Sequence, residues 1–354
     1  MILDYTGFGK RGRYPIGYRI TESDVGVRYK QRNSIDAPAM DFLSVIKINS
    51  SYIELVDRWY PIRGFWAWLS VVLGLGSILA GGALVYASFF PLEDPLVSGG
   101  GEKFFLVAIS LMFFLLAWFG AWYAFKEECL GYTHYPIRLN RKSRQVYFFR
   151  QDGTVLTVPW DSLFLTLGES KNPLVGTTYD LRAHVLDGDG ETVRESFSLG
   201  YPSPIGNAQS VDKFWAFLQT YMEAEDGVER TWSHLKEKTG YLVPVDNRRE
   251  GWRWSIARSF MLGAHWPYLQ LLFSPFLGLN ALGRMLAMST SKIPQWPKEV
   301  ERANSEEPDD PYRLTWRDNG PLGWWELYWP LLCIVIGVGA FVGALGWIVS
   351  SLWR

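Results

Sequence analysis

Three long runs without a charged residue constrain this chain more than any other feature of its sequence. They extend from Gly64 to Leu92, from Phe104 to Phe125 and from Leu327 to Trp353. Each run exceeds the roughly 20 apolar residues that cross a bilayer as a helix. A buried core helix in a water-soluble protein rarely needs such length, so the sequence predicts three transmembrane helices.

The charges around the first two runs predict their orientation. The link between the runs carries Glu93, Asp94 and Glu102 with a single base, whereas lysines and arginines stand on both outer flanks. These flanking bases are Arg58, Arg63, Lys126, Arg138, Arg141, Lys142 and Arg144. Because short cytoplasmic loops carry the excess of Lys and Arg, we expect the link in the periplasm of a bacterial inner membrane and the main polar domain in the cytoplasm.

A fourth uncharged run, from Ser259 to Gly283, leaves the number of crossings open at three or four. Pro267 and Pro275 interrupt it, and proline removes a backbone donor and bends a helix. A full crossing would also place the bases of residues 292–317 in the periplasm, against the positive-inside rule. We therefore expect a re-entrant or interfacial helical hairpin in this run, and three crossings in total.

Small residues recur at one-turn spacing in two of the runs. Gly76 and Ala80 stand in the first run, and Gly339 and Gly343 in the third. Small side chains let two helices approach closely inside a bilayer, so these residues are candidates for helix packing. Two interpretations stay open: a seam between the two copies of a homodimer, and packing of the first span on the third within one chain. We favour the second.

Between the second and third runs, hydrophobic residues alternate with polar ones at a period of two, which is typical of strands. The expected strands are residues 136–140, 145–150, 154–158, 178–186 and 192–199. Asp152-Gly153 and Asp187-Gly-Asp-Gly190 lie between neighbouring strands, and such turns favour β-hairpins. The sequence therefore predicts two antiparallel hairpins.

An amphipathic helix is expected after these strands, from Ser210 to Glu223. Trp215 lies on its apolar face, while Lys213, Gln219 and Glu223 lie on the face expected to point into solvent. A run of short strands that ends in one packing helix predicts a small α+β domain.

The order of elements from Pro136 to Ala224 resembles the pleckstrin-homology-like domain that follows a transmembrane hairpin in small bacterial membrane proteins. The basic turn Asn140-Arg-Lys-Ser-Arg144 and the segment Val158-Pro-Trp160 carry the resemblance. It implies a cytoplasmic, β-rich α+β domain of this kind, beside the three or four membrane helices expected from the uncharged runs. Arg141, Lys142 and Arg144 become candidates for lipid-headgroup contacts, because juxtamembrane bases gain ~1 kcal/mol each from an anionic leaflet. A purely topological role for them is the interpretation we favour.

Motifs of the common enzyme classes are missing from the sequence. No histidine pair has zinc-protease spacing, and neither a phosphate-binding loop nor a nucleophile elbow occurs. The chain has only two cysteines, which cannot form a cysteine-based zinc site. We therefore predict no catalytic residues, no cofactor and no metal site. A formal net charge of -1 disfavours nucleic acid as a partner.

These patterns predict six consecutive regions. They are an N-terminal cytoplasmic segment (1–62), a transmembrane hairpin (63–125), a cytoplasmic β-rich domain with its terminal helix (126–250), the re-entrant or interfacial hairpin (251–290), a Pro/Trp-containing cytoplasmic loop (291–323) and a C-terminal transmembrane helix (324–354).

The Pro/Trp-containing loop carries a second resemblance. Its residues read Ser291-Lys-Ile-Pro-Gln-Trp-Pro-Lys-Glu-Val300 and then Glu307-Pro-Asp-Asp-Pro-Tyr312, after Gly283-Arg-Met-Leu-Ala287. With the transmembrane hairpin and the β-rich domain, this pattern resembles an uncharacterised family of Gram-negative inner-membrane proteins found alongside type VI secretion effectors. The resemblance implies a non-enzymatic immunity protein that binds and neutralises a cognate protein effector. A membrane-anchored scaffold or lipid-sensing module is the alternative.

Overall fold

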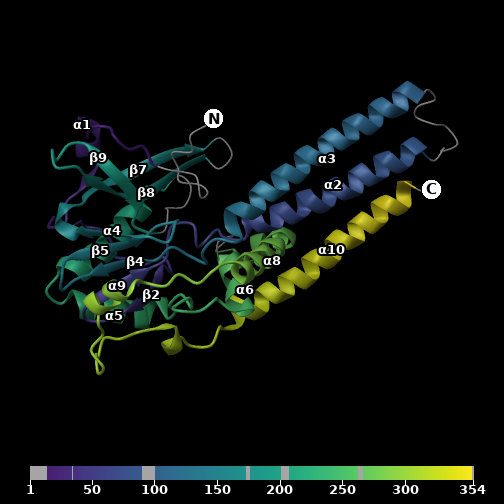
Figure 1. Ribbon diagram of the computed structural model, residues 1–354. Coiled ribbons are helices and arrows are strands. Elements are labelled where there is room, and N and C mark those ends of the chain that lie inside the picture. Colours follow the sequence, from purple (N-terminus) through teal and green to yellow (C-terminus); the bar gives the residue numbers. More distant parts are fainter. Residues whose placement is uncertain are drawn as a thin grey trace. The chain divides into compact units, whose positions relative to one another are not determined.

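The computed structural model describes residues 14–33, 35–89, 100–172, 176–200, 207–261 and 266–352. The chain divides into two compact units that alternate along the sequence (Figure 1). The first unit holds the residues up to 61, 132–254 and 292–323, and the second holds 62–131, 255–291 and 324–354. Most of the expected periplasmic link, at 93–99, lies outside the described residues, as do His265 and Arg354.

One sheet of the first unit is a five-stranded antiparallel meander in the order β2-β3-β4-β5-β6. Its strands are β2 (Val45–Ile48), β3 (Tyr52–Leu55), β4 (Ile137–Asn140), β5 (Gln145–Phe149) and β6 (Val155–Pro159). Leu55 in β3 pairs with Ile137 in β4, although the expected transmembrane hairpin separates them in the sequence. Residues from both sides of that hairpin therefore build one sheet, so the first unit is not divided at residue 62 as the sequence pattern indicates.

The second sheet of the first unit is also antiparallel, in the order β1-β7-β8-β9. It consists of β1 (Arg28–Tyr29), β7 (Phe164–Asn172), β8 (Gly176–Leu186) and β9 (Val193–Ser198), with α1 (Glu22–Gly26) before it and the 3-10 turn η1 (Trp160–Ser162) between the sheets. The five strands expected from alternation are confirmed as β4, β5, β6, β8 and β9. The sequence pattern missed β1, β2, β3 and β7.

Helix α4 closes the hydrophobic core of the first unit. It is followed by further helical turns: α4 (Gln209–Glu223), α5 (Gly227–His234) and the π-helix η2 (Leu235–Thr239). Trp215 of α4 is fully buried, and its ring stacks on Trp160 with 5.7 Å between centroids. Tyr29 of β1 adds a third ring at 5.8 Å from Trp215. The expected apolar face of α4 is confirmed.

The expected solvent-facing side of α4 is covered instead. Gln219 is buried, and its amide nitrogen donates to the main-chain carbonyls of Gln31 and Asn33 at 2.7 Å each. Glu223 accepts a hydrogen bond from the indole Nε1 of Trp160 at 2.6 Å. Chain that precedes β2 lies against this face, and helical periodicity alone cannot reveal such long-range cover.

Residues 292–314 form a strap across the face of the five-stranded sheet that points away from the core. The strap contains α9 (Lys298–Ala303) and precedes the 3-10 turn η3 (Trp316–Asp318). Its Trp296 ring lies 4.8 Å from the buried guanidinium of Arg138 in β4. The main chains of Leu314 and Ile48 exchange hydrogen bonds at its far end. Both faces of this sheet are therefore buried, and the Pro/Trp pattern has a structural role.

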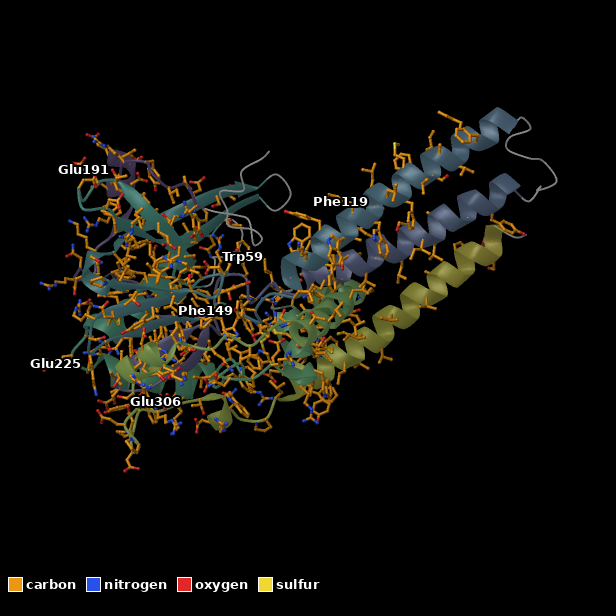
Figure 2. All side chains as sticks on the ribbon, in the orientation of Figure 1. Trp59, Phe119, Phe149, Glu191, Glu225 and Glu306 are labelled. Atoms are coloured by element: carbon orange, nitrogen blue, oxygen red, sulfur yellow. The ribbon has the colours of Figure 1, made fainter. Side chains whose placement is uncertain are left out.

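The second unit contains three helices long and apolar enough to cross a membrane. Its elements are α2 (Phe65–Phe89), α3 (Gly100–Glu128), α6 (Trp252–Met261, whose first turn counts with the first unit), α7 (Pro267–Leu272), α8 (Ser274–Thr290), the π-helix η4 (Trp324–Tyr328) and α10 (Trp329–Leu352). The apolar windows are Phe65–Ala83, Val107–Lys126 and Trp324–Ala344. Figure 2 shows carbon-rich side chains along these helices, among them Phe119, which is 68% exposed. Three helices of this character were expected, and that expectation is confirmed.

Helices α2 and α3 are joined at their base by a carboxylate cap. Glu128, the last residue of α3, accepts hydrogen bonds from the main-chain amides of Gly64 and Ala67 at 2.9 and 3.0 Å. These amides belong to the start of α2, where helical N–H groups lack partners within the helix. Arg63 donates to the main-chain carbonyl of Glu128 at 2.8 Å. Arg63 is therefore part of the packing and not a free flanking charge.

The fourth uncharged run forms shorter helices, α6 to α8, rather than one helix of spanning length in its described part. Helix α8 packs closely on two of the long helices. A Cβ on Gly283 would lie 2.2 Å from the main-chain oxygen of Gly64, and a Cβ on Gly278 would lie 3.4 Å from Ile334 in α10. Glycine is needed at position 283 because backbone approaches backbone there.

We expect Trp215→Ala to lower the free energy of unfolding of the first unit by ~3 kcal/mol or more, because truncating a buried aromatic leaves a cavity. Lys213 lies on another face of α4 and is only partly buried, so Lys213→Ala should cost less than ~0.5 kcal/mol. Thermal unfolding of the purified full chain, followed by near-ultraviolet circular dichroism, measures both. Equal losses would show that the packing face of α4 is assigned wrongly.

Candidate functional site

A cavity of about 630 Å³ opens in the first unit between β5 of one sheet and β9 of the other. We call it the β5–β9 cavity. Its walls are residues 57–59, residues 150–152 and residues 194–198, with Tyr14, Ile16, Tyr135 and Phe148. It is the larger of the two cavities described here, and its mixed aromatic and charged lining makes it the candidate binding site.

An aromatic stack joins the two sheets at this cavity. Phe148 of β5 and Phe197 of β9 lie parallel, with 4.6 Å between ring centroids. Trp59, labelled in Figure 2, forms another part of the wall, and the guanidinium of Arg58 lies 4.7 Å from its ring. Asp57 fixes this segment, since its carboxylate accepts hydrogen bonds from the amides of Trp59 and Tyr135 at 3.0 and 2.8 Å. The cavity wall is therefore held by rigid contacts.

A buried ionic cluster connects the wall residues Tyr14 and Arg58 to strand β8. Asp180 of β8 is fully buried, and its carboxylate lies 3.4 Å from Arg58 and 3.0 Å from Arg182. The hydroxyl of Tyr14 donates to the same carboxylate at 3.0 Å. A side chain on Gly168 of the neighbouring strand would collide with this cluster, because its Cβ would lie 2.5 Å from an Asp180 oxygen. Glycine at that position leaves room for the two guanidinium groups.

The protonation states of this cluster follow from its contacts. Burial alone would raise the pKa of Asp180, but the guanidiniums of Arg58 and Arg182 outweigh burial and hold that pKa below its usual value. Burial raises the pKa of Tyr14 to about 12, against the opposing effect of Arg58. Asp180 is therefore ionised and Tyr14 protonated at neutral pH, so the hydrogen bond between them runs from phenol to carboxylate.

The rim of the cavity carries one base that is paired and one that is not. Arg150 binds both carboxylate oxygens of Glu195 at 2.8 and 2.6 Å, which ties the end of β5 to β9. Arg194 is exposed and has no hydrogen-bond or ion-pair partner among the described residues. Its guanidinium can thus reach a ligand without first breaking a contact within the protein.

Strand β9 is the last strand of its sheet, and its outer edge is paired at Val193, whose main chain bonds to Gly17 and Tyr18. The amide of Leu199 donates to the carbonyl of Leu181, so odd-numbered residues from 195 to 199 face β8. The main-chain groups of Ser196 and Ser198 consequently point away from the sheet. No described residue pairs with them through the main chain. Such an edge can accept an added strand from a partner.

The three bases predicted as lipid-headgroup contacts bind acceptors within the first unit. Arg141 donates to the main-chain carbonyls of Tyr221 and Ala224, which satisfies the C-terminal end of α4. Lys142 lies 2.6 Å from Glu307 of the strap. Arg144 binds both oxygens of Asp161 and one of Glu223. Contact of this turn with lipid stays a prediction, but each base already has a structural partner.

The predicted small-residue faces are open in the second unit. A Cβ on Gly76, Gly339 or Gly343 would meet nothing within 4 Å, and Ala80 is exposed. Helix α2 instead contacts α3 through its other small residues: a Cβ on Gly81 would lie 3.6 Å from Phe114. The packing of the first span on the third through these four residues is thus not what the structure has, and the homodimer seam stays a prediction.

The chain therefore combines a unit of two antiparallel sheets with a unit that holds three membrane-length apolar helices. Residues 113–308, more than half of its length, match DUF6708, which is described as a family of unknown function. The chain belongs to this family. No curated protein and no solved structure matches it. The matched region includes β5, β9 and the ionic-cluster residues of β8, but it begins after Tyr14 and Arg58.

We expect Asp180→Asn to lower the free energy of unfolding by ~3–5 kcal/mol near neutral pH, because two buried guanidiniums lose their counter-charge. The carboxyl has a lower pKa folded than unfolded, where it is about 3.9. Its stabilising effect is therefore complete above about pH 4 and is lost as pH falls through the folded-state pKa.

Thermal unfolding of the full chain over a series of pH values measures this effect. The acid loss of stability should be shallower in Asp180→Asn than in the parent chain. Asp226→Asn is the matched control, since Asp226 forms an exposed ion pair with Arg230 and should contribute under ~0.5 kcal/mol. Similar losses in the two variants would contradict the role of the buried cluster.

Proposed function

We propose that the chain is a multi-pass protein of a bacterial inner membrane whose first unit faces the cytoplasm. The pairing of β3 with β4 supports this topology, since Leu55 and Ile137 sit opposite each other in one sheet. The chain that leaves β3 must return to the same side before β4, so α2 and α3 together make an even number of crossings. The bases that flank this hairpin favour the cytoplasmic side.

The same reasoning supports an even number of crossings for residues 255–291. The chain before them is tied to the first unit, because the amide of Val243 donates to the carbonyl of Val45 at 2.8 Å. The chain after them is tied to it as well, through the main-chain bond from Thr133 to Lys292 at 2.8 Å. If residues 255–291 make no crossing, these ties support three crossings in total, with α10 leading the C-terminus to the periplasm.

The contacts of α8 support a re-entrant path rather than one along the membrane surface. Gly337, near the middle of the apolar window Trp324–Ala344, leaves no room for a Cβ beside Ser274 at the start of α8. Gly283, further along α8, meets Gly64 at the start of α2. Ser274 and Gly283 are nine residues apart in α8, which corresponds to ~13 Å along the helix, close to half of a ~30 Å hydrocarbon core. A hairpin that enters one leaflet and returns fits these contacts.

For the activity, we propose a non-enzymatic immunity protein that binds and neutralises a cognate type VI secretion effector. The observation that carries binding as the function is the β5–β9 cavity, with the unpaired Arg194 beside the edge of β9 at Ser196 and Ser198. The identity of the partner rests on the resemblance of the Pro/Trp pattern. An anchored protein with such a surface needs only a tight complementary contact to block a toxin.

A pleckstrin-homology-like fold for residues 136–224 remains part of this proposal. One antiparallel sheet followed by another and then by α4 supports it. A membrane-anchored scaffold or lipid-sensing module is the alternative function. The internal partners of Arg141, Lys142 and Arg144 weigh against this turn as the lipid contact, since headgroup binding there would have to displace those partners.

The topology is tested by fusions and by labelling. With three crossings, a C-terminal alkaline phosphatase fusion should be active and a C-terminal green fluorescent protein fusion dark. Ser98→Cys, in the link between the first two spans, should react with an impermeant thiol reagent in cells whose outer membrane is permeabilised. The native Cys129 and Cys333 are buried and give little background. An inactive phosphatase beside a fluorescent partner fusion would indicate four crossings.

Neutralisation is tested in cells that receive the effector encoded beside this chain. Expression of the chain should restore growth, and unchanged killing would overturn the immunity proposal. Arg194→Glu should abolish protection at equal membrane abundance, because it reverses the charge of the unpaired base on the rim. Lys238→Glu is the matched control, an exposed base outside the cavity, and should protect fully. Full protection by Arg194→Glu would rule out the cavity rim as the contact.

A further inference from the structure

Three arginines of the first unit rest against tryptophan rings instead of carboxylates. The guanidinium of Arg248 lies 4.1 Å from the ring centroid of Trp316, and that of Arg317 lies 4.8 Å from the same ring. Arg253 lies 5.4 Å from the ring of Trp252. Across the described residues, none of these three arginines forms an ion pair. Their charge is therefore available to an external anion.

A second cavity, of about 270 Å³, lies among these residues, and we call it the Arg–Trp cavity. Its walls include Arg248 and Arg253 and the rings of Tyr241, Trp254 and Trp316, and none of its lining residues is acidic. Arginine is suited to such a place, because its planar fork can donate two parallel hydrogen bonds to a phosphate while its face stacks on an aromatic ring.

The acidic groups next to these arginines in the sequence are engaged elsewhere. Asp318 accepts hydrogen bonds from the amide and the hydroxyl of Thr315 at 2.8 and 3.2 Å. Glu250 is buried and accepts a hydrogen bond from the hydroxyl of Tyr60. Neither carboxylate neutralises the cavity, so its lining is positive.

The chain places the Arg–Trp cavity beside the start of a predicted span. Leu322 lines the cavity and stands two residues before Trp324, where the third apolar window begins. Consecutive Cα atoms are 3.8 Å apart, so this wall lies within about 8 Å of the span. Trp252 and Trp324 are 51% and 57% exposed, as expected of rings at the level of lipid headgroups.

We propose that the Arg–Trp cavity binds the phosphate of an anionic phospholipid from the leaflet on the side of the first unit. This inference rests on the proposed membrane topology, and it names a site different from the predicted turn at Arg141. Arg248 and Arg253 hold the phosphate, while Arg317 adds charge beside it. The tryptophan rings contact the glycerol region, where amphipathic rings are favoured.

The test uses the purified full chain in detergent with equal amounts of phosphatidylglycerol and phosphatidylethanolamine. Native mass spectrometry counts the lipids retained. The parent chain should retain phosphatidylglycerol preferentially, and the triple variant Arg248→Gln, Arg253→Gln, Arg317→Gln should lose that preference by tenfold or more, since each juxtamembrane base contributes about a fivefold preference. Arg302→Gln, an exposed base of α9 outside this cavity, should behave like the parent.

Two further arms separate the causes of a negative result. Short-chain phosphatidylglycerol should compete for the site at concentrations where inorganic phosphate does not, and equal competition would identify a site for free anions and overturn the lipid assignment. Alkaline extraction of membranes should leave the parent and the triple variant in the pellet. Release of both would refute the membrane topology itself, whereas retention of both with unchanged lipid preference would refute only the Arg–Trp cavity. Arg253→Gln alone, at an exposed position, repeats the measurement should the triple variant misfold.

Discussion

The pairing of β3 with β4 is the interaction on which the rest of the structure depends. Glu54 and Arg138 face each other directly in this pair, and Arg138 donates to the Glu54 carboxylate through two nitrogens at 2.9 and 2.7 Å. Both side chains are buried, so their desolvation must be offset by close contacts. The rings of Tyr52 and Trp296, 4.4 and 4.8 Å from the guanidinium, supply such contacts.

This arrangement explains why the first unit is assembled from three stretches of chain. Strands β2 and β3 come before the apolar hairpin in the sequence, and strands β4 to β6 come after it. The strap of residues 292–314, which covers the sheet, follows α8 in the sequence. Because the chain returns to this sheet after each apolar segment, the sheet restricts where each of those segments can begin and end.

Local patterns were sufficient to predict the long apolar helices, the hairpin strands and the buried face of α4, because periodicity and length determine each of them. They failed for β2 and β3. Lys47 and Glu54 are charged but buried in an ion network covered by the strap, so the strands lack the alternation of a sheet with one wet face. The segment that contains β2 and β3 therefore looked like an N-terminal segment without strands.

The candidate site was predictable only in part. Asp180 and Arg182 stand two apart in a predicted strand, which places both on one face, so a charged cluster there could have been proposed. Their partner Arg58 looked like a flanking base of a transmembrane helix, and nothing local connects it to β8. Arg141 likewise looked free for lipid, because the α4 carbonyls that it binds lie far along the chain. Long-range hydrogen bonding decided the role of each arginine.

The interrupted sheet has a consequence for how the protein is made on the ribosome. Glu54 and Arg138 are 84 positions apart, so at ~5–20 residues per second several seconds separate their synthesis. During that interval β2 and β3 exist as an isolated hairpin, which in water is marginally stable at best. The sheet therefore cannot be completed until α2, α3 and β4 have all been made. Until then the edge of β3 that pairs with β4 has no partner, and an unpaired strand edge is prone to join another chain.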